Sequence, residues 1–296
     1  GDYAASRGDS HDPASLLWRR RCIGWPFHCG SCPSTDRLSL PIRMNPAEFA
    51  NIAATEESFW WFRGMNRMLW DFLASHYSPS EGDRALEVGC GTGFVSAEFA
   101  RRYPEVSLSS MDLATEGLRY AQGRGLRGLT QGDIRWLPFA SGRCGALLVL
   151  DVIAHLERSE EEAAFAEFAR VLTPGGLLVL RASAFSWLQS RHSQFVNERQ
   201  RYTLSGLLPP MRRAGFVPVR HTYANALLLP VALLKFRVWE PLTNAAPESG
   251  LEAPHPALNG ALEAVLMTEA AMIRAGARFP VGQSLWMIAR KGKDGC

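Results

Sequence analysis

Short segments that fit buried strands alternate along the chain with segments in which apolar residues recur every three or four positions. The clearest strand is 144–150, a continuous apolar run of the kind found in central parallel strands. The other candidate strands are 85–88, 106–112, 129–131, 177–182, 216–222 and 284–290. Helical spacing marks 94–100, 115–120, 160–172 and 204–214. Strands alternating with helices predict an α/β fold on a parallel, doubly wound sheet.

A helical region precedes the first strand, over 45–77. Asn45 is a suitable N-cap, Pro46 suits the first turn, and Glu48 stands at the capping-box position. Gly64 lies in the middle of the region and is expected to break it into two helices. The pattern predicts an amphipathic helix pair that covers one face of the sheet.

Aromatic residues are unusually dense in this region, at 59–62. They fit the buried face of a covering helix. An alternative interpretation places Trp61 and Arg63 over a cofactor, with Arg63 pairing with a carboxylate.

Three glycines follow the first strand at alternate positions, Gly89, Gly91 and Gly93. Without side chains they let the backbone turn sharply and approach a ligand closely. The next helix directs its N-terminal amides at whatever lies above this loop. The dinucleotide fingerprint G-x-G-x-x-G is not met, because Phe94 occupies the place of its third glycine. An acidic residue, Glu87, precedes the loop.

Two more acidic residues stand where nucleoside recognition requires them. Asp112 ends the second strand, about 20 residues beyond the glycines, where a carboxylate accepts hydrogen bonds from ribose hydroxyls. Asp133 follows the third strand and is placed to accept from an adenine amino group, with Ile134 packing on the ring. The loop and these two positions together predict a nucleoside-containing ligand.

Composition narrows the class of protein. The 296 residues are 47% hydrophobic, enough for one large α/β domain with an insertion, and the formal charge of +3 is dispersed. A nucleic-acid surface would group basic and aromatic residues, and none is expected here. The six scattered cysteines favour a reduced, cytoplasmic setting. The longest apolar run, 226–234, is too short to span a bilayer, although peripheral membrane contact is compatible with it.

Residues 1–43 differ from the rest because they show no sustained periodicity. They hold Cys29, Cys32 and His28, half of the ligand set of a zinc site. The second half is missing nearby, so no metal is expected. We predict a disordered leader that ends before Met44.

The predicted organisation therefore has five parts. They are the leader 1–43, an N-terminal helical cap 44–83, a nucleoside-binding core 84–226, a helical insertion or substrate cap 227–280, and the final strand with its tail, 281–296.

Several motifs together resemble class I methyltransferases, over about 56–291. They are residues 87–93, Asp112, 132–134 with 137–138, and 170–177. The resemblance implies a seven-stranded, mostly parallel sheet whose last strand is antiparallel, with the helical insertion before it. It also implies S-adenosylmethionine (SAM) as methyl donor. The residues expected at the donor are Glu87, Gly89, Cys90, Gly91, Gly93, Asp112, Leu113, Asp133, Ile134, Leu150, Trp61 and Arg63.

Three further segments, 59–64, 201–203 and 279–285, are similar to a bacterial subgroup of small-molecule methyltransferases. In that subgroup the residue after the first segment is often basic, whereas here it is Met65.

Methyl transfer needs alignment above all, and a general base only when the acceptor atom carries a tightly held proton. The candidates for a base are His155, after the fourth strand, and His192 or Tyr202, after the fifth. Each has an ordinary alternative role, as a packed or solvated histidine or as an anchor for its loop.

The acceptor is expected to be a small, partly apolar molecule. The motifs of nucleobase methylation, Asn/Asp-Pro-Pro-aromatic and Pro-Cys, are missing from the sequence. Two other functions stay open: a SAM-binding protein without transfer activity, and a NAD(P)-dependent oxidoreductase. The sequence does not fix the oligomeric state.

Overall fold

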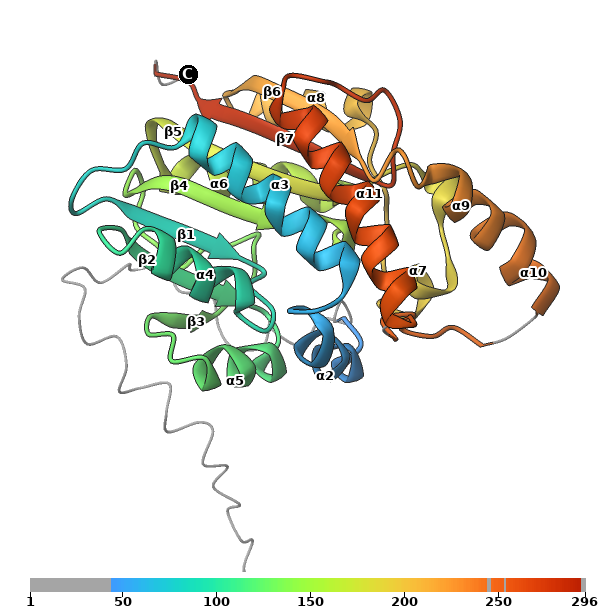
Figure 1. The fold of residues 1–296 in the computed structure, drawn as a ribbon. Coiled ribbons are helices and arrows are strands. Elements are labelled where there is room, and N and C mark those ends of the chain that lie inside the picture. The colour runs from blue at the N-terminus through green and yellow to red at the C-terminus, as the bar shows by residue number, and fades with distance from the viewer. Residues whose placement is uncertain (1–43, 244–245, 253, 294–296) are drawn as a thin grey trace, which may run out of the picture. The chain divides into compact units, whose positions relative to one another are not determined.

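The structure, a computed structural model, describes residues 44–243, 246–252 and 254–293. The predicted leader 1–43 and its cysteine pair lie outside the described residues. Within the described part, seven strands form one sheet in the order β3-β2-β1-β4-β5-β7-β6 (Figure 1). The strands are β1 (Arg84–Val88), β2 (Ser107–Asp112), β3 (Leu129–Gln131), β4 (Cys144–Leu150), β5 (Leu172–Ser183), β6 (Phe216–Ala224) and β7 (Ser284–Lys291).

Only β7 runs against its neighbours in this sheet. Its partners β5 and β6 both pair with it in antiparallel register, while β1 to β5 pair in parallel. The predicted fold, a mostly parallel seven-stranded sheet with an antiparallel last strand, is confirmed.

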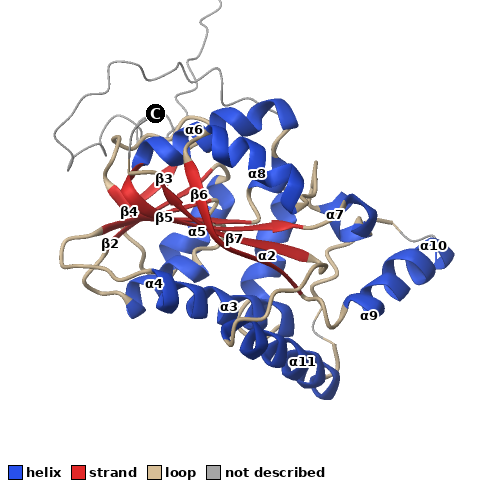
Figure 2. Ribbon diagram, turned by 90° about the horizontal axis from the view of Figure 1, so that it is seen from above, coloured by secondary structure: helices blue, strands red, loops and turns tan. Residues whose placement is uncertain are grey.

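Helices cover both faces of the sheet (Figure 2). Near the N-terminus are α2 (Pro46–Thr55), α3 (Trp60–His76), α4 (Phe94–Arg102) and α5 (Thr115–Gly123). After β4 come η3 (Ile153–His155), η4 (Arg158–Glu160), α6 (Glu161–Val171), η5 (Ser186–Leu188), α7 (Arg191–Phe195) and α8 (Leu204–Arg213). The insertion before β7 holds α9 (Leu229–Leu234), the π-helical η6 (Lys235–Trp239), α10 (Glu240–Thr243) and α11 (Pro256–Arg274).

Alternate side chains of the strands enter two apolar cores. On one face, residues such as Leu148 and Trp286 pack under α3 and α11. On the other, residues such as Leu147 pack under α6 and α8. Because β4 is buried on both faces, its residues do not alternate between polar and apolar, and the strand is apolar throughout. No helix in the described part of the chain is long and apolar enough to cross a membrane.

Gly64 does not break the N-terminal helix, so that prediction is wrong. The break lies at 56–59, and Gly64 is buried inside α3. A Cβ at this position would stand 2.3 Å from Cδ2 of Leu266 in α11. The glycine therefore serves close approach of two helices, which outweighs its low helix propensity. Asn45 caps α2 as expected, with its side chain accepting from the Ala47 amide at 3.1 Å.

Candidate functional site

The glycine loop has the strained backbone that its sequence predicts. Gly89, Gly91 and Gly93 adopt φ angles of 72°, 52° and 76°, a region that side chains disfavour. A Cβ at Gly89 would collide with Val152 at 2.6 Å. At Gly91, in contrast, no atom lies within 4 Å of the Cβ position. The backbone at Gly91 is therefore where a ligand has room to approach the loop.

Asp112 stands beside this open position, at the end of β2. Its Oδ2 accepts from the Gly91 amide at 2.8 Å, and its Oδ1 accepts from the Ala114 amide at 2.8 Å. Burial raises the pKa of Asp112, and the amides of Ala114 and Gly91 counteract that rise. Each carboxylate oxygen has two lone pairs, so each keeps one for a further donor. The arrangement presents a fixed, double acceptor next to the loop.

Helix α2 closes over the loop through Glu56 at its C-terminal end. The buried Glu56 carboxyl accepts from Thr92 Oγ1 at 2.5 Å and pairs with Arg124 at 2.5 Å. Burial raises the pKa of Glu56, while Thr92 and Arg124 oppose the rise. The N-terminal cap is thereby fastened to the glycine loop by a residue that the sequence analysis did not single out.

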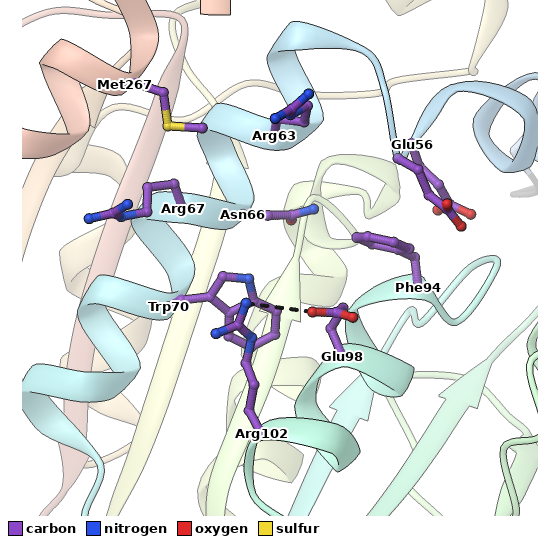
Figure 3. Close-up of a pocket in the computed structure, with 10 residues that line it drawn as sticks. Glu56, Arg63, Asn66, Arg67, Trp70, Phe94, Glu98, Arg102 and Met267 are labelled. Atoms are coloured by element: carbon purple, nitrogen blue, oxygen red, sulfur yellow. Dashed lines mark ion pairs between the residues drawn. The ribbon is translucent and has the colours of Figure 1, made fainter. Parts of the chain in front are cut away.

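A pocket of about 240 Å³ lies between α3, α4 and α11, close to the loop (Figure 3). Its lining carries three arginines and three glutamates, and Arg102 lies over the Trp70 ring at 4.6 Å. Glu98 and Arg102, one turn apart on α4, pair at 3.5 Å on one side of it. The charges match in number, so the pocket does not select an anion. Asp112 does not line it, and the pocket is therefore separate from the acceptor pair at β2.

Glu87 lies beneath the loop, with 2% of its surface exposed. Its carboxyl contacts the Ser96 hydroxyl, which in turn is 2.6 Å from the Ser110 hydroxyl. Burial raises the pKa of Glu87 to about 8. Glu87 was expected to contact the ligand, but in this position its carboxyl group faces the protein interior. It supports the loop from inside.

The other residues expected at the donor lie around the same edge of the sheet. Cys90 is buried, with its thiol pKa raised by burial, while Leu113 and Leu150 are half-buried at the ends of β2 and β4. Ile134 is buried. All four are positioned by the strands that end here.

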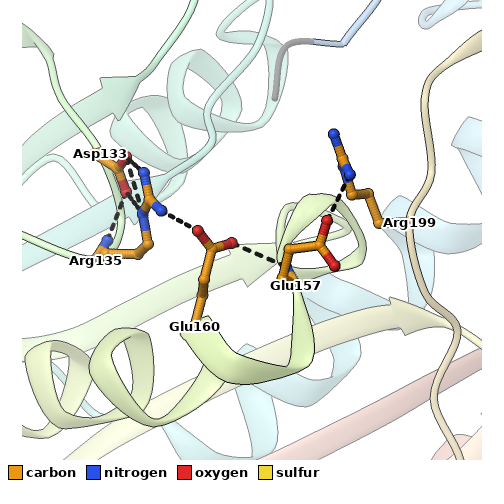
Figure 4. A network of polar contacts seen from close by, with 5 residues as sticks. All are labelled: Asp133, Arg135, Glu157, Glu160 and Arg199. Atoms are coloured by element: carbon orange, nitrogen blue, oxygen red, sulfur yellow. Dashed lines mark hydrogen bonds and ion pairs between the residues drawn. The ribbon is translucent and has the colours of Figure 1, made fainter. Parts of the chain in front are cut away.

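Asp133 is engaged by a neighbour that the sequence analysis did not consider (Figure 4). Arg135 donates from Nε and Nη2 to the Asp133 carboxylate at 2.6–3.1 Å and also pairs with Glu160. Glu160 accepts from the Glu157 amide at 2.9 Å, and Glu157 pairs with Arg199. Much of the acceptor capacity expected for an adenine amino group is therefore taken up by Arg135.

A second carboxylate, Asp151, stands immediately after β4 with a left-handed φ of 59°. Arg181 of β5 donates to its Oδ2 from Nε at 2.8 Å and pairs through Nη2 at 2.7 Å. The guanidinium lies 4.9 Å from the Trp61 ring and 5.3 Å from the Trp286 ring. Arg181 Nη1 is buried without a partner among the described residues.

Trp61 therefore lies over the side chain of Arg181. The carboxylate that pairs with Arg63 belongs to another residue of the protein. Arg63 pairs with Glu263 of α11 at 2.9 Å and is half exposed. Arg181 is not among the residues predicted for the site, although a charged residue inside the apolar run 177–182 is a signal for a functional position.

The three base candidates lie in different environments. His155 is in η3, with Nδ1 3.3 Å from the Asn197 carbonyl oxygen, and burial lowers its pKa. His192 is 43% exposed and lies 3.7 Å from Glu48. Tyr202 is buried: its hydroxyl donates to the Ile153 carbonyl at 3.1 Å, and burial raises its pKa.

The geometry brings His155 close to the strand ends and argues against Tyr202 as a catalytic residue. The Tyr202 hydroxyl also accepts from Gln200 Nε2 at 2.6 Å, so both of its hydrogen-bonding directions are used inside the protein. Its role is to anchor the segment after β5. In the described part of the chain, no group of three or more His, Cys, Asp or Glu side chains is arranged to hold a metal.

Comparison with known proteins finds similarity over the loop and its strands. Residues 85–176 match the family model of a methyltransferase domain. The chain is 36% identical over 99 residues to a fatty-acid O-methyltransferase of Mycolicibacterium smegmatis, covering 32% of this chain and 35% of that protein. It is 27% identical over 162 residues to a ubiquinone biosynthesis O-methyltransferase of Albidiferax ferrireducens, covering 51% and 62%. The chain spans less than two thirds of the length of the curated relatives it matches.

Solved structures share the fold at low identity. A chain of the Haloferax volcanii complex between the Trm112 methyltransferase activator and its methyltransferase partner has a TM-score of 0.53 and 16% identity, covering 83% of this chain and 98% of that one. The [4+2]-cyclase SpnF has a TM-score of 0.50 and 20% identity, covering 77% and 82%. The fold is thus found in proteins described by different reactions.

Proposed function

We propose that this chain, whose residues 85–176 form a class I methyltransferase domain, transfers a methyl group from SAM to a small molecule. The observation that carries the proposal is the Asp112 carboxylate, held at 2.8 Å by the amides of Gly91 and Ala114. Its remaining lone pairs suit two adjacent ribose hydroxyls, and the open Gly91 backbone leaves room for the rest of a nucleoside.

The described residues fit SAM as follows. Asp112 would hold the ribose, Ile134 and Leu113 would flank the adenine, and Gly91 would approach the amino-acid part. SAM supplies a methyl group on a positively charged sulfur, which leaves as a neutral thioether. The protein's contribution is to align the acceptor with that methyl group and to exclude water, because in-line displacement depends on alignment.

We place the acceptor on the side of the site formed by Asp151, Arg181 and Trp61. This side lies where β4 and β5 end, beside Leu150. His155 follows on the same loop, and its lowered pKa keeps the imidazole neutral at pH 7, as a proton acceptor must be. The relatives named above methylate fatty acids and ubiquinone precursors, which supports a partly apolar acceptor held under the insertion 227–280. We place the reaction in the cytoplasm, in line with the free thiols of Cys90 and Cys144.

A second candidate function is SAM binding without methyl transfer. It is favoured by the likeness to a [4+2]-cyclase, since a shared fold does not carry a shared reaction. A NAD(P)-dependent oxidoreductase is the third. The glycine spacing argues against it, because the third glycine stands one position early.

Calorimetric titration of SAM tests the donor site. Wild type should bind, and Asp112→Ala should bind at least about tenfold more weakly, a difference of about 1.4 kcal/mol. Glu162→Ala is the matched control, because Glu162 is an exposed carboxylate of α6. Wild type that is folded but binds NADH instead of SAM would overturn the proposal. SAM binding without methyl transfer to fatty acids or quinone precursors would favour the second candidate.

A further inference from the structure

The segment 227–243, here called the arm, extends away from the sheet in both views (Figures 1 and 2). It comprises α9, η6 and α10, and it starts at the edge of the sheet where β6 ends. Glu240 connects it to α7, because the Glu240 carboxylate accepts from the Arg191 amide at 2.9 Å. At its start, the amides of Ala226 and Leu227 donate to the Glu269 carboxylate at 2.8 Å.

One face of the arm is an exposed apolar stripe. Four of its members recur every three or four residues through the consecutive helices α9, η6 and α10, so they lie near one another along one side of the arm, and the fifth lies in the turn before α9. They are 41–77% exposed, and they are Leu227, Val231, Leu234, Val238 and Leu242. Trp239 adds a sixth large apolar side chain, 64% exposed. The opposite side, with Leu229 and Ala232, is buried against the protein.

Two cations border this stripe. Lys235 and Arg237 are both exposed, and neither forms an ion pair with another described residue. Lys235 directly follows Leu234 and Arg237 directly precedes Val238, so the two cations flank the stripe on opposite sides. An apolar strip with leucine, valine and tryptophan, flanked by basic side chains, is the composition of a helix that lies in a membrane interface.

We propose that the arm docks this protein on the surface of an anionic lipid bilayer. The apolar stripe enters the boundary between headgroups and acyl chains, and Lys235 and Arg237 contact the lipid phosphates. The arm is too short to span a bilayer, so it lies in the plane of the interface. The carboxyl ends of the parallel strands face the same side as the arm and would then be near molecules held in the bilayer (Figure 1).

A second copy of the chain is a less suitable occupant. In a two-fold symmetric dimer the same patch meets itself, which would bring the cations of both copies around one apolar contact. Like charges at such a distance repel, whereas an anionic lipid surface neutralises them.

Vesicle co-sedimentation tests the proposal. The full chain should sediment with phosphatidylcholine vesicles that contain phosphatidylglycerol, less with pure phosphatidylcholine, and less at high salt. The variant Val231→Glu/Leu234→Glu/Val238→Glu should bind about tenfold more weakly or not at all. Lys235→Gln/Arg237→Gln should lose the preference for the anionic vesicles. The matched control is Val217→Glu/Val219→Glu, because these valines are equally exposed on β6, and it should bind like wild type.

Two further measurements keep the result unambiguous. Circular dichroism and SAM titration of the triple variant should match wild type, which separates loss of membrane binding from loss of the fold or of the donor site. The proposal is overturned by wild type that stays in solution with every vesicle, or by a triple variant that sediments normally. It is equally overturned if light scattering shows a wild-type dimer that the triple variant abolishes.

Discussion

Asp112 and Asp151 stand at the ends of β2 and β4, on either side of β1, and are held in opposite ways. Asp112 receives two backbone amides, one of them two residues away. Asp151 receives the guanidinium of Arg181, which is itself enclosed by aromatic rings from α3 and β7. The first carboxylate has no cation as a hydrogen-bond partner and keeps lone pairs for a ligand. The charge of the second is already balanced, so it positions groups without attracting cations.

The largest effect on stability is expected when Arg181, the cation that pairs with Asp151, is removed. Arg181→Met keeps the apolar contacts with Trp61 and Trp286 but leaves Asp151 without a counter-charge. Since Asp151 is 31% exposed, the cost is expected below that of a fully buried pair, at about 2–3 kcal/mol of unfolding free energy. Urea denaturation followed by circular dichroism measures it.

The control for this variant is the other half of the pair. Arg181→Met/Asp151→Asn should recover most of the loss, because no uncompensated charge remains and asparagine tolerates the left-handed φ. If the two substitutions are simply additive, the ion pair is not what links these residues.

A third carboxyl group, Glu87, accepts a hydrogen bond from a serine hydroxyl instead of a guanidinium or a backbone amide, and it should differ from both aspartates in its response to pH. Its folded-state pKa of about 8 lies above the ordinary value of 4.5, so the folded protein holds a proton that the unfolded chain has lost. Stability should therefore fall as pH rises from about 5 to 8, by up to about 1.4 kcal/mol per unit, or about 2 kcal/mol between pH 6 and 8.

Glu87→Gln should remove most of this slope, because an amide does not titrate. Urea midpoints at pH 6, 7 and 8 for both proteins give the comparison. Parallel slopes in wild type and variant would show that Glu87 is ionised throughout.

The contrast between the two aspartates also explains what the sequence could predict. Asp112 depends on contacts close in sequence and on a strand end, so the pattern of strand, glycine loop and acid was enough to place it. The same holds for the seven strands and for the antiparallel β7, which the family resemblance implied. The site around Asp151 needs Trp61, Arg181 and Trp286, which come together only through the order of the strands and the packing of α3. The spacing of these three residues along the chain does not predict that they are in contact.

Two predictions from the sequence, for Gly64 and Tyr202, differ from the structure because distant contacts outweigh the local pattern. Gly64 has the propensity of a helix breaker, but its lack of a side chain is used by Leu266, 202 positions away along the chain. Tyr202 follows a polar segment like a functional residue, yet its hydroxyl is consumed by Gln200 and Ile153.

Gly64→Ala tests whether the packing of α3 against α11 depends on the missing side chain at position 64. The new Cβ would collide with Leu266, and the expected net cost is about 1–2 kcal/mol, the overpacking loss reduced by the better helix propensity of alanine. Gly260→Ala in α11 is the control. No atom lies within 4 Å of its Cβ position, so it should stabilise by up to about 1 kcal/mol. Thermal unfolding is measured for both variants and for Gly64→Ala/Leu266→Ala, which removes Cδ2 and Cγ, the two atoms nearest the new Cβ. Equal effects at Gly64 and Gly260 would contradict the packing argument.

The smallest effect is expected for Asp112→Asn, which tests whether Asp112 binds SAM through its charge or through its shape. Asp112→Asn is nearly isosteric, and its one carbonyl oxygen still accepts from the Gly91 or Ala114 amide, but the other position becomes a donor. Hydrogen bonds to a charged acceptor exceed neutral ones by about 1 kcal/mol, so SAM affinity should fall about fivefold, less than in Asp112→Ala. Asp151→Asn should leave SAM affinity within about twofold, because Arg181 already neutralises that carboxylate. Calorimetry on the two asparagine variants therefore separates the sites: equal losses would mean that both carboxylates contact the donor, and the division into a donor side and an acceptor side would have to be given up.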